Sequence, residues 1–304
     1  MKNKFYRGGD ISVELSHVDK VFWPEEHITK GDIIEYYDKI YPYIIPYLKD
    51  RPESLRRNPN GILDRGFFQK NVKEIVPDWA KTIVLYSESA AKDIEYFICN
   101  DKASLLYLVN LGCIELNPWN SRISTIDNPD YCILDLDPSE KNTFDDIVKV
   151  ALAVRRIADV AGIPSFCKTS GATGIHIYIP LGAMYTYEEC RAFALLLAKT
   201  VVKELPELTT IERSLKKRPP DKIYIDYLQN KKGQTLASAY SVRPRPHATV
   251  STPLEWNEVK TGLRPEQFTI KNIFKRLDKN GDLFAGVLDK GIDLKRALQS
   301  LETT

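Results

Sequence analysis

The chain has 304 residues, and its 43 lysines and arginines nearly balance its 41 aspartates and glutamates, which leaves a formal charge of +2. That balance excludes a uniformly basic nucleic-acid coat, while 43% hydrophobic and 28% charged residues exclude a disordered or membrane-embedded chain. Five cysteines, with no C-x-x-C pair and no cysteine–histidine cluster, argue against a disulfide scaffold and a structural zinc site. The N-terminus carries no apolar leader segment, so we expect a cytoplasmic protein.

Four threonines stand where the N-cap of a helix is expected: Thr29, Thr143, Thr186 and Thr269. The first precedes apolar residues at helical spacing, and Pro42 and Pro46 should end or kink that helix. Asp146 and Glu189 follow the second and third threonines at the spacing of a capping box. We therefore expect two long amphipathic helices, over residues 143–162 and 186–206.

Five short apolar segments have strand character: 131–136, 163–166, 175–179, 222–228 and 235–242. Helices and strands are interspersed without a fixed period, and no internal repeat or low-complexity linker is visible. This order predicts an α+β architecture, and no glycine-rich fingerprint recommends a dinucleotide fold.

Three acidic residues stand in or at the end of apolar strands. Asp135 and Asp137 are two residues apart, so both carboxylates point to the same face of the strand. Asp226 interrupts a second apolar strand, where an unpaired charge would be costly to bury. Like charges this close favour a divalent cation with oxygen ligands, and three of them permit two-metal phosphoryl transfer.

Other readings of the acidic pattern remain open or fail. The segment Asp135-Leu-Asp137-Pro-Ser139 is close to the D-x-D-x-(T/V) of haloacid-dehalogenase-type phosphatases, but it lacks the Thr/Val and the later acidic loop. A calcium loop at 278–282 fails because its glycine comes too early. A D-x-D pair alone can also be a loop cap or a surface pair.

Two further segments suit phosphate binding. The loop from Lys168 to His176, K-T-S-G-A-T-G-I-H, offers small residues for close backbone approach, the Ser170 hydroxyl and an imidazole, and it is not a Walker loop. Arg243 and Arg245 stand two residues apart in a basic stretch, and an extended backbone would place both guanidinium groups on one side. Acids holding metals and bases holding phosphates together indicate nucleotidyl transfer.

The ordered set of motifs resembles the polymerase domain of bacterial ligase D, within the archaeo-eukaryotic primase superfamily. The motifs are D-L-D, K-T-S-G-x-x-G-x-H, I-D-Y-L-Q-N, S-V-R-x-R, V-D-K-V-F-W-P, I-T-K-G-D-I-I-E-Y-Y, G-F-F-Q-K-N and S-T-P-L-E-W, from about Val18 to Asp282. The resemblance implies an α+β primase-like core over residues 1–304. An N-terminal α/β module (about 1–125) would pack on an RRM-like catalytic module (about 126–250), with the active site in the cleft between them and a C-terminal extension (about 251–304).

By this resemblance, Asp135, Asp137 and Asp226 hold two Mn²⁺ or Mg²⁺ ions and no zinc, and Asp226 assists deprotonation of the primer hydroxyl. A further set of side chains is expected at the incoming nucleotide: Ser170, His176, Gln229, Arg243 and Arg245.

The resemblance also implies contacts with DNA. Lys20 and Lys30 match the family's pocket for a 5′-phosphate on the downstream strand, where two ammonium groups can select a true end by its extra charge. Phe67 and Phe68 are expected to stack on DNA without reading its sequence. The residues alone do not say which of the two faces outward.

Two positions depart from the family pattern. Asn117 stands where relatives commonly have the histidine of L-H-P-W, and Thr173 stands where they commonly have the lysine of S-G-G-K-G. Both changes remove positive or proton-donating capacity, so we expect weaker nucleotide affinity with the chemistry retained.

The sequence thus predicts a polymerase that adds NTPs or dNTPs, with a ribonucleotide preference implied by resemblance, to 3′-hydroxyls at gaps and broken ends in non-homologous end joining. Ku and an ATP-dependent DNA ligase are the implied partners, and the enzyme is expected at the nucleoid and not at a membrane. Two alternatives remain, a metal-dependent phosphatase and a non-catalytic DNA-end-binding module.

Overall fold

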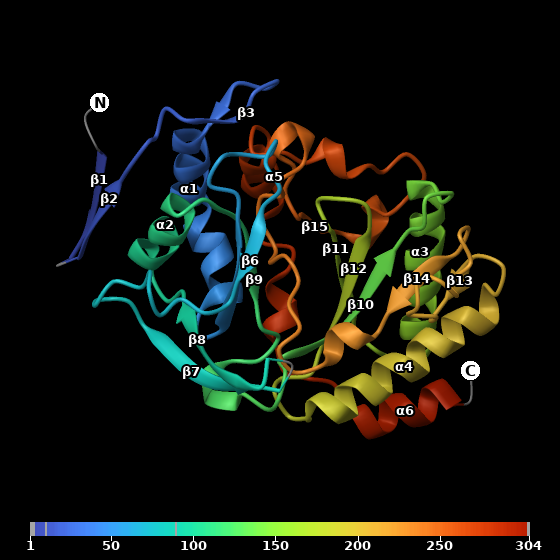
Figure 1. Ribbon diagram of the computed structural model, residues 1–304. Helices are drawn as coiled ribbons and strands as arrows, with labels where there is room; N and C mark the ends of the chain where they lie inside the picture. Colours follow the sequence, from blue (N-terminus) through green and yellow to red (C-terminus); the bar gives the residue numbers. More distant parts are fainter. Residues whose placement is uncertain (1–3, 10, 89, 303–304) are drawn as a thin grey trace.

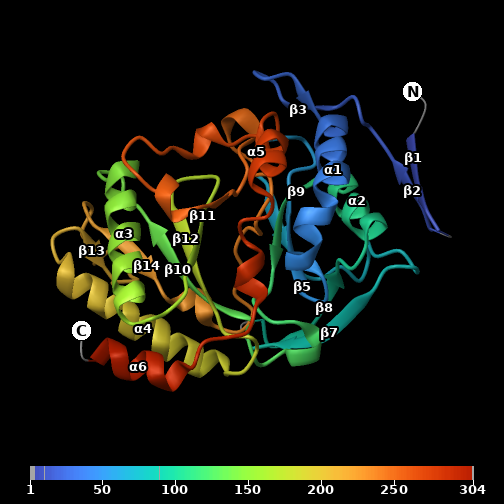
Figure 2. The same cartoon turned by 180° about the vertical axis from the view of Figure 1, so that it is seen from behind.

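The computed structural model describes residues 4–9, 11–88 and 90–302, and two large sheets lie side by side in it (Figure 1, Figure 2). The five-stranded sheet contains β6 (Phe67–Gln69), β5 (Pro52–Arg57), β8 (Lys92–Ile98) and β7 (Thr82–Ser87) in that order, and β9 (Cys113–Pro118) also pairs with β5. The six-stranded sheet has the order β13 (Thr209–Thr210), β14 (Ile223–Asp226), β10 (Tyr131–Asp137), β12 (Ile175–Pro180), β11 (Phe166–Thr169) and β15 (Pro253–Leu254). The α+β class expected from the sequence is confirmed.

The helices and two small hairpins complete the fold. The helices are α1 (Lys30–Leu48), α2 (Lys102–Asn110), α3 (Phe144–Val160), α4 (Tyr187–Glu204), α5 (Ile273–Asn280) and α6 (Leu294–Glu302). The hairpins are β1 (Lys4–Gly8) with β2 (Ile11–Leu15), and β3 (Val21–Trp23) with β4 (Ile28–Thr29). In Figure 1, α3, α4 and α6 lie on one side of the six-stranded sheet, and α1 and α2 lie beside the five-stranded one.

Strand β10 is apolar from Tyr131 to Leu134, because both of its faces are buried there. Its side chains at 132, 134 and 136 belong to the core that α3, α4 and α6 cover. Tyr131 and Ile133 point the other way, into a second core that includes α1, α2 and β9. With period-two alternation, Asp135 and Asp137 continue this second face, so the two carboxylates turn toward the N-terminal half of the chain.

Local capping patterns predicted the starts of three helices correctly. Thr29, Thr143 and Thr186 each accept a hydrogen bond from the backbone N–H three residues on and complete a capping box. The first helix does not end at its prolines, however. It continues through Pro42 and Pro46 to Leu48, and its last turns are packed against the core.

Two sequence predictions were wrong at element boundaries near helices. The fourth helix begins at Ile273 behind Asn272, and Thr269 does not cap it. The strand expected over 163–166 begins only at Phe166. Ile163 instead closes α3, since its N–H bonds to Ala158 O at 2.8 Å after a left-handed Gly162, so its apolar side chain marks a helix end.

The apolar segment 235–242 is not a strand, contrary to expectation, and takes part only in isolated bridges. Tyr240 has φ of 65°, which no regular strand allows. The N–H of Ser238 bonds to Leu116 O in β9, whereas the N–H of Tyr240 bonds to Ser251 O. The segment is apolar because it is buried between elements, and its backbone groups find separate partners.

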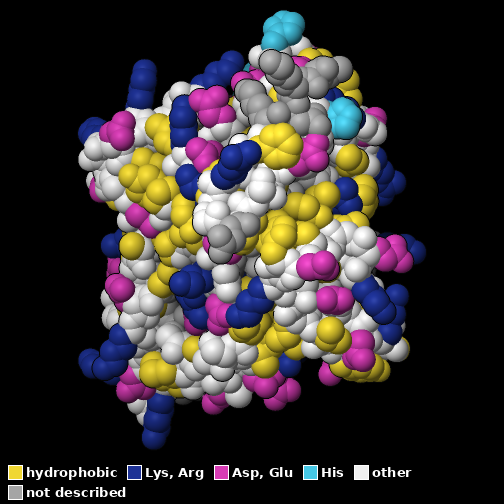
Figure 3. All heavy atoms as spheres, turned by 90° about the vertical axis from the view of Figure 1, so that its left-hand side faces the viewer, with side chains coloured by type: hydrophobic (Ala, Val, Ile, Leu, Met, Phe, Trp, Pro, Cys, Tyr) yellow, Lys and Arg dark blue, Asp and Glu magenta, His cyan; other side chains and the backbone are white. Residues whose placement is uncertain are grey.

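No helix in the described part of the chain combines the length and the hydropathy that a membrane span requires. Figure 3 shows the face on the side of the N-terminal hairpin, where basic, acidic and hydrophobic side chains are interspersed. The exposed Phe5, Val84 and Tyr86 belong to β1 and β7, the first strands of two hairpins. This mixture agrees with the small net charge of +2.

Asp282 fastens the C-terminal segment to α1, and its removal should destabilise the fold. Its carboxylate accepts the hydroxyls of Tyr47 at 2.7 Å and Tyr240 at 2.5 Å, and both tyrosines are buried. Because Asp282→Ala leaves two buried hydroxyls unpaired, we expect the free energy of unfolding to fall by about 2–4 kcal/mol in urea denaturation. Asp278→Ala, at an exposed position of α5, is the control and should change it by less than about 0.5 kcal/mol. Equal values for both variants would contradict this role.

Candidate active site

Three carboxylates meet on the inner face of the six-stranded sheet. Asp135 of β10 pairs directly with Asp226 of β14, and Asp137 follows two residues after Asp135. One oxygen from each of the three side chains can be chosen so that all lie within 4.8 Å of one another. The sequence predicted that Asp135 and Asp137 share one face of a strand, and the pairing of β14 with β10 adds Asp226.

The carboxylates repel one another in a largely dry environment. Asp135 is only 5% exposed, and burial together with Asp137 and Asp226 raises its pKa well above the usual range. Burial and Asp226 also raise the pKa of Asp137, against the opposing effect of Arg218 and Arg243. Three hard oxygen donors that cannot all be ionised without a counter-charge fit Mg²⁺ or Mn²⁺.

Hydrogen bonds from three directions orient Asp226. Its Oδ1 accepts the Tyr224 hydroxyl at 3.1 Å and the Leu228 N–H at 2.8 Å, and its Oδ2 accepts Gln229 Nε2 at 3.1 Å. Gln229 lies in the 3₁₀ turn Leu228–Asn230, which follows β14. That strand ends at Asp226, whereas the sequence predicted a strand over 222–228. The structure therefore brings Gln229 to the carboxylates, as the sequence predicted.

The loop between β11 and β12 is held together by Ser170. The Ser170 Oγ accepts the N–H groups of Ala172 at 3.1 Å and Gly174 at 3.0 Å, which curls the backbone around the hydroxyl. Gly171 has φ of +69°, and a Cβ there would lie 2.7 Å from Arg243 Cγ. Glycine is required at this position on both grounds, because a side chain would push the arginine away.

His176 lies next to the carboxylates, in register with Asp135. Its Nε2 is 3.4 Å from Asp135 Oδ1, and its Nδ1 is 2.8 Å from Lys168 Nζ. Burial, Lys168 and Arg243 lower the pKa of His176 well below the usual range. The structure brings the His176 ring to Asp135, and the expected contact of His176 with the phosphates of the nucleotide stays a prediction.

Arg243 and Arg245 diverge, contrary to the extended arrangement expected. Arg243 donates Nε to Glu115 Oε2 at 2.8 Å and Nη1 to Ser170 O, so it turns inward. The Arg245 N–H bonds to Arg243 O at 2.8 Å and closes a tight turn at Pro244. The Arg245 side chain is exposed, and nothing in the described ranges connects its guanidinium group to the other site residues.

Sequence reasoning missed two charged residues of the site. Glu115 interrupts the apolar strand β9, reaches across from the other sheet and holds Arg243. Arg218, in the basic run 213–222, stacks 3.9 Å from the ring centre of Tyr224 and lowers the pKa of Asp137. A charge inside an apolar strand singled out Asp226, and the same signal would have found Glu115.

Lys20 and Lys30 line one pocket of about 270 Å³, together with Arg57. Lys20 Nζ donates to Asn60 Oδ1 at 2.5 Å, and Lys30 Nζ donates to Ser16 O at 2.6 Å. Burial and the neighbouring Lys20 lower the pKa of Lys30 to about 8. The structure therefore brings the two lysines expected at a terminal phosphate together, and it adds an arginine.

Phe67 and Phe68 are both exposed, at 46% and 55%, and face opposite sides of β6. In the strand register Phe68 pairs with Arg56, and Phe67 pairs with Arg57. The guanidinium carbons lie 5.0 and 5.5 Å from the respective ring centres. Arg56 also pairs with Glu115, so Phe68 shares the face of the residue that holds Arg243, and Phe67 lies on the side of the lysine pocket.

The two departures from the family pattern lie in different surroundings. Asn117 is buried, and its Nδ2 is 3.4 Å from Glu115 O. Thr173 is exposed and lines a pocket of about 420 Å³ together with Arg264. The expected loss of nucleotide affinity stays a prediction.

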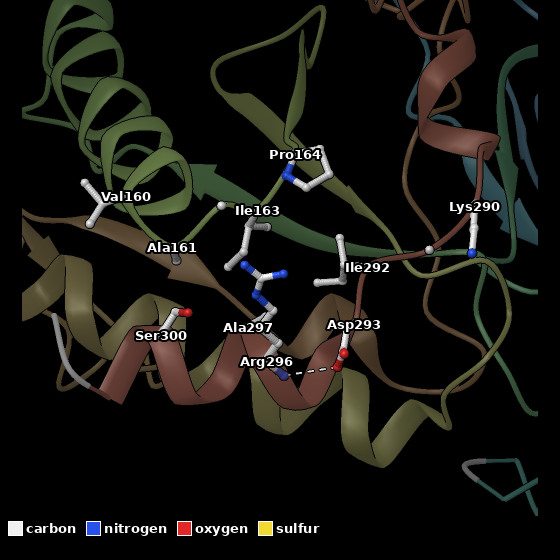
Figure 4. A pocket seen from close by; sticks show the side chains of 12 residues that line it. Val160, Ala161, Ile163, Pro164, Lys290, Ile292, Asp293, Arg296, Ala297 and Ser300 are labelled. Carbon is white, nitrogen blue, oxygen red and sulfur yellow. Dashed lines mark hydrogen bonds between the residues drawn. The ribbon is translucent and has the colours of Figure 1, made fainter.

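A pocket of about 470 Å³ lies away from these residues, between the end of α3 and the start of α6 (Figure 4). Ile163, Ile292 and Arg296 are among its lining residues, and the Arg296 N–H donates to Asp293 Oδ1 at 3.1 Å. None of the side chains expected at the site lines it, so the carboxylates and not this pocket define the candidate active site.

Comparison with known proteins decides the family. A family model described as "LigD, primase-polymerase domain" matches residues 29–284. The chain belongs to the LigD primase-polymerase domain family. This match confirms the resemblance inferred from the motifs and, at the level of enzyme class, the polymerase-type nucleotidyltransferase. It does not favour the phosphatase alternative.

Two curated relatives support the same family. The "Bifunctional non-homologous end joining protein LigD" of Bacillus subtilis (strain 168) is 36% identical over 271 residues, which make up 88% of this chain and 43% of that protein. The "Multifunctional non-homologous end joining protein LigD" of Mycolicibacterium smegmatis is 28% identical over 276 residues, 90% of this chain and 36% of that protein. The chain thus spans less than half the length of these curated relatives.

A solved structure matches the fold over nearly its whole length. The "Polymerase Domain from Mycobacterium tuberculosis Ligase D in complex with DNA" superposes with a TM-score of 0.84 and 26% sequence identity. The match covers 92% of this chain and 99% of that one. The primase-like fold predicted from the sequence is therefore confirmed.

The raised pKa values of Asp135 and Asp137 predict how metal and pH act on stability. A carboxyl whose pKa is higher in the folded state stabilises the fold fully below its unfolded pKa of about 3.9, and this contribution is lost as the pH rises through the folded value. In EDTA, the melting temperature should therefore fall as the pH rises from about 4 toward neutrality, and Mn²⁺ should restore it increasingly.

The control compares two aspartates by thermal melting at several pH values. Asp135→Asn should reduce both the pH dependence and the Mn²⁺ effect, whereas Asp127→Asn, at an exposed aspartate outside the carboxylate site, should leave both unchanged. A Mn²⁺ effect that survives Asp135→Asn would place the metal elsewhere.

Proposed function

We propose that this chain adds nucleotides to the 3′-hydroxyl of DNA at gaps and broken ends, using either NTPs or dNTPs. The observation that carries the proposal is the convergence of Asp135, Asp137 and Asp226 within 4.8 Å, beside a loop and an arginine suited to phosphates. Two divalent ions bound there would neutralise the phosphates and the attacking and leaving oxygens of an in-line displacement. The oxygen-only donor set favours Mn²⁺ or Mg²⁺ over zinc.

Three side chains would bind phosphate, order the loop and accept a proton around the nucleotide. Arg243 has donors left after its bonds to Glu115 and Ser170, so it can bind phosphate oxygens while the carboxylate fixes its direction. Ser170 orders the loop by accepting two N–H groups, and its hydroxyl hydrogen can still be donated. Asp226, oriented by the hydrogen bond from Gln229, would accept the proton of the primer hydroxyl.

The DNA would be held by the other sheet. The pocket of Lys20, Lys30 and Arg57 gathers three cations at one place, which suits the doubly charged 5′-phosphate of a downstream strand. Phe67 and Phe68 expose ring faces on the two sides of β6, and a base can stack on each without sequence readout. A preference for ribonucleotides remains a proposal from the family resemblance.

The cellular role would be end joining. The relatives named above carry non-homologous end joining in their names, and this chain covers less than half of their length. We infer that Ku and an ATP-dependent DNA ligase are the partners, and that the ligase seals the strand. The enzyme would then work at the nucleoid.

A primer-extension assay tests the proposed function. The chain should extend the 3′-end of a gapped, 5′-phosphorylated duplex in the presence of Mn²⁺ and either NTPs or dNTPs. Asp137→Ala removes one metal ligand and should lower the rate by at least about 1,000-fold, with unchanged DNA affinity in a gel-shift measurement. Asp127→Ala is the control and should be as active as the parent.

Each alternative gives a different product in the same assay. Release of inorganic phosphate without extension would indicate a phosphatase, and binding without any product would indicate an end-binding module. Either result contradicts the polymerase.

The lowered pKa of Lys30 predicts a pH limit on the recognition of a terminal phosphate. Lys30 is charged below its pKa of about 8, so the preference for 5′-phosphorylated over 5′-hydroxyl gapped DNA should be strongest below pH 8 and fall about tenfold above it. Fluorescence anisotropy with both duplexes at each pH from about 7 upward measures this ratio, since the terminal phosphate, with a second pKa of about 6, is already doubly charged there.

Two variants test whether Lys30 causes this pH dependence. Lys30→Met should remove the pH dependence, and Lys20→Met should shift it to higher pH because Lys20 depresses the Lys30 pKa. Arg57 stays charged over this range and supplies the residual preference. A ratio that is independent of pH in the parent would show that Lys30 does not bind the phosphate.

A further inference from the structure

Lys168 completes a row of polar side chains across four neighbouring strands. Asp226 pairs with Asp135, Asp135 pairs with His176, and His176 pairs with Lys168. Because directly paired residues of antiparallel strands present their side chains to the same face, the row reads carboxylate, carboxylate, imidazole, amine. Lys168 is 0% exposed, so it reaches the site only through His176.

Three acceptors surround the Lys168 amine. Its Nζ lies 2.8 Å from His176 Nδ1, 2.8 Å from Ala237 O and 2.6 Å from Ser251 Oγ. The Ser251 hydroxyl donates its own hydrogen to Thr169 O at 3.0 Å, so it must accept from the lysine. An ammonium group has three N–H donors, and these three partners satisfy all of them.

The ammonium form of Lys168 also suits the Asp135 carboxylate, which lies on the other side of the His176 ring. Burial and Arg243 lower the pKa of Lys168 well below its usual range, although Asp135 and Glu115 act in the opposite direction, so it is the three acceptors around Nζ that favour the ammonium form. A neutral amine would offer only two N–H donors and would have to accept a hydrogen bond from Nδ1–H. With Asp135 ionised, the unprotonated Nε2 would then face its Oδ1 at 3.4 Å, lone pair against carboxylate.

We propose that Lys168 is a positioning residue for nucleotidyl transfer, which holds the His176 ring as its Nε2–H tautomer. Donation from Lys168 to Nδ1 leaves the ring proton on Nε2, on the side of Asp135. The ring then presents a fixed hydrogen-bond donor where the metal ligands and the phosphates of the nucleotide would meet. This inference rests on the proposed function for its role in catalysis, but the tautomer itself is a property of the chain.

The tautomer can be measured on the unaltered protein. The chain has four histidines, so long-range ¹H–¹⁵N correlation spectra contain few imidazole signals, and His176→Gln identifies the one of interest. With Mg²⁺, which is diamagnetic, we expect the nitrogen shifts of an Nε2–H ring. An Nδ1–H pattern would overturn the proposal, and this measurement decides it even where a variant does not fold.

Kinetics test whether the lysine acts through the histidine. Lys168→Met keeps the apolar stem but removes the donor, and it should lower kcat/KM for the nucleotide about 10–100-fold with unchanged DNA affinity. If both residues act as one unit, Lys168→Met combined with His176→Gln should be no slower than His176→Gln alone. Multiplying effects would show that Lys168 acts independently and would overturn the assignment.

A matched control and the two readouts separate the possible failures. Lys141→Met, at an exposed lysine, should leave kcat/KM unchanged. An inactive parent would contradict the proposed function, and the tautomer spectrum would still report on the lysine contact. An active parent with an Nδ1–H ring, or with an unaffected Lys168→Met variant, would contradict this inference alone.

Discussion

Three negative charges gathered within 4.8 Å of one another form the constraint on which the rest of this structure depends. The strand register imposes the arrangement, since Asp135 is paired with Asp226 whether or not their charges are compensated. Burial makes the repulsion severe and raises the pKa of Asp135. Lys168 and Arg243 oppose that shift only in part, so the site is suited to bind added positive charge.

The site draws on both sheets, and ion pairs between distant segments set its geometry. Arg243, from the segment after β14, is held by Glu115 of β9 in the other sheet. Arg51, fully buried, donates to Asp130 just before strand β10 and lies 5.2 Å from the ring centre of Tyr131. Buried pairs of this kind contribute little net stability, but losing one partner is costly, so they fix one relative placement of the segments they join.

The aspartates and the lysine pocket each suit one part of a two-part substrate, a nucleotide and a DNA terminus. A nucleotide with its phosphates suits the face of Asp135 and Arg243, and a DNA terminus suits the pocket of Lys20 and Lys30. Strand β6 contributes to both places, because Phe68 faces the side of Glu115 and Phe67 faces the side of the lysine pocket. Recognition of a gap would then follow from geometry, since both parts must be engaged at once.

The sequence by itself determined what depends on neighbours along the chain. Capping boxes at Thr143 and Thr186 predicted helix starts, and period-two alternation placed Asp135 and Asp137 on one face, because these patterns act over two to four residues. Only the tertiary structure decided that segment 235–242 is not a strand and that Glu115 and Arg218 lie at the site. Those outcomes depend on partners brought together from far along the chain, where burial and strand register, and not local propensity, select the conformation.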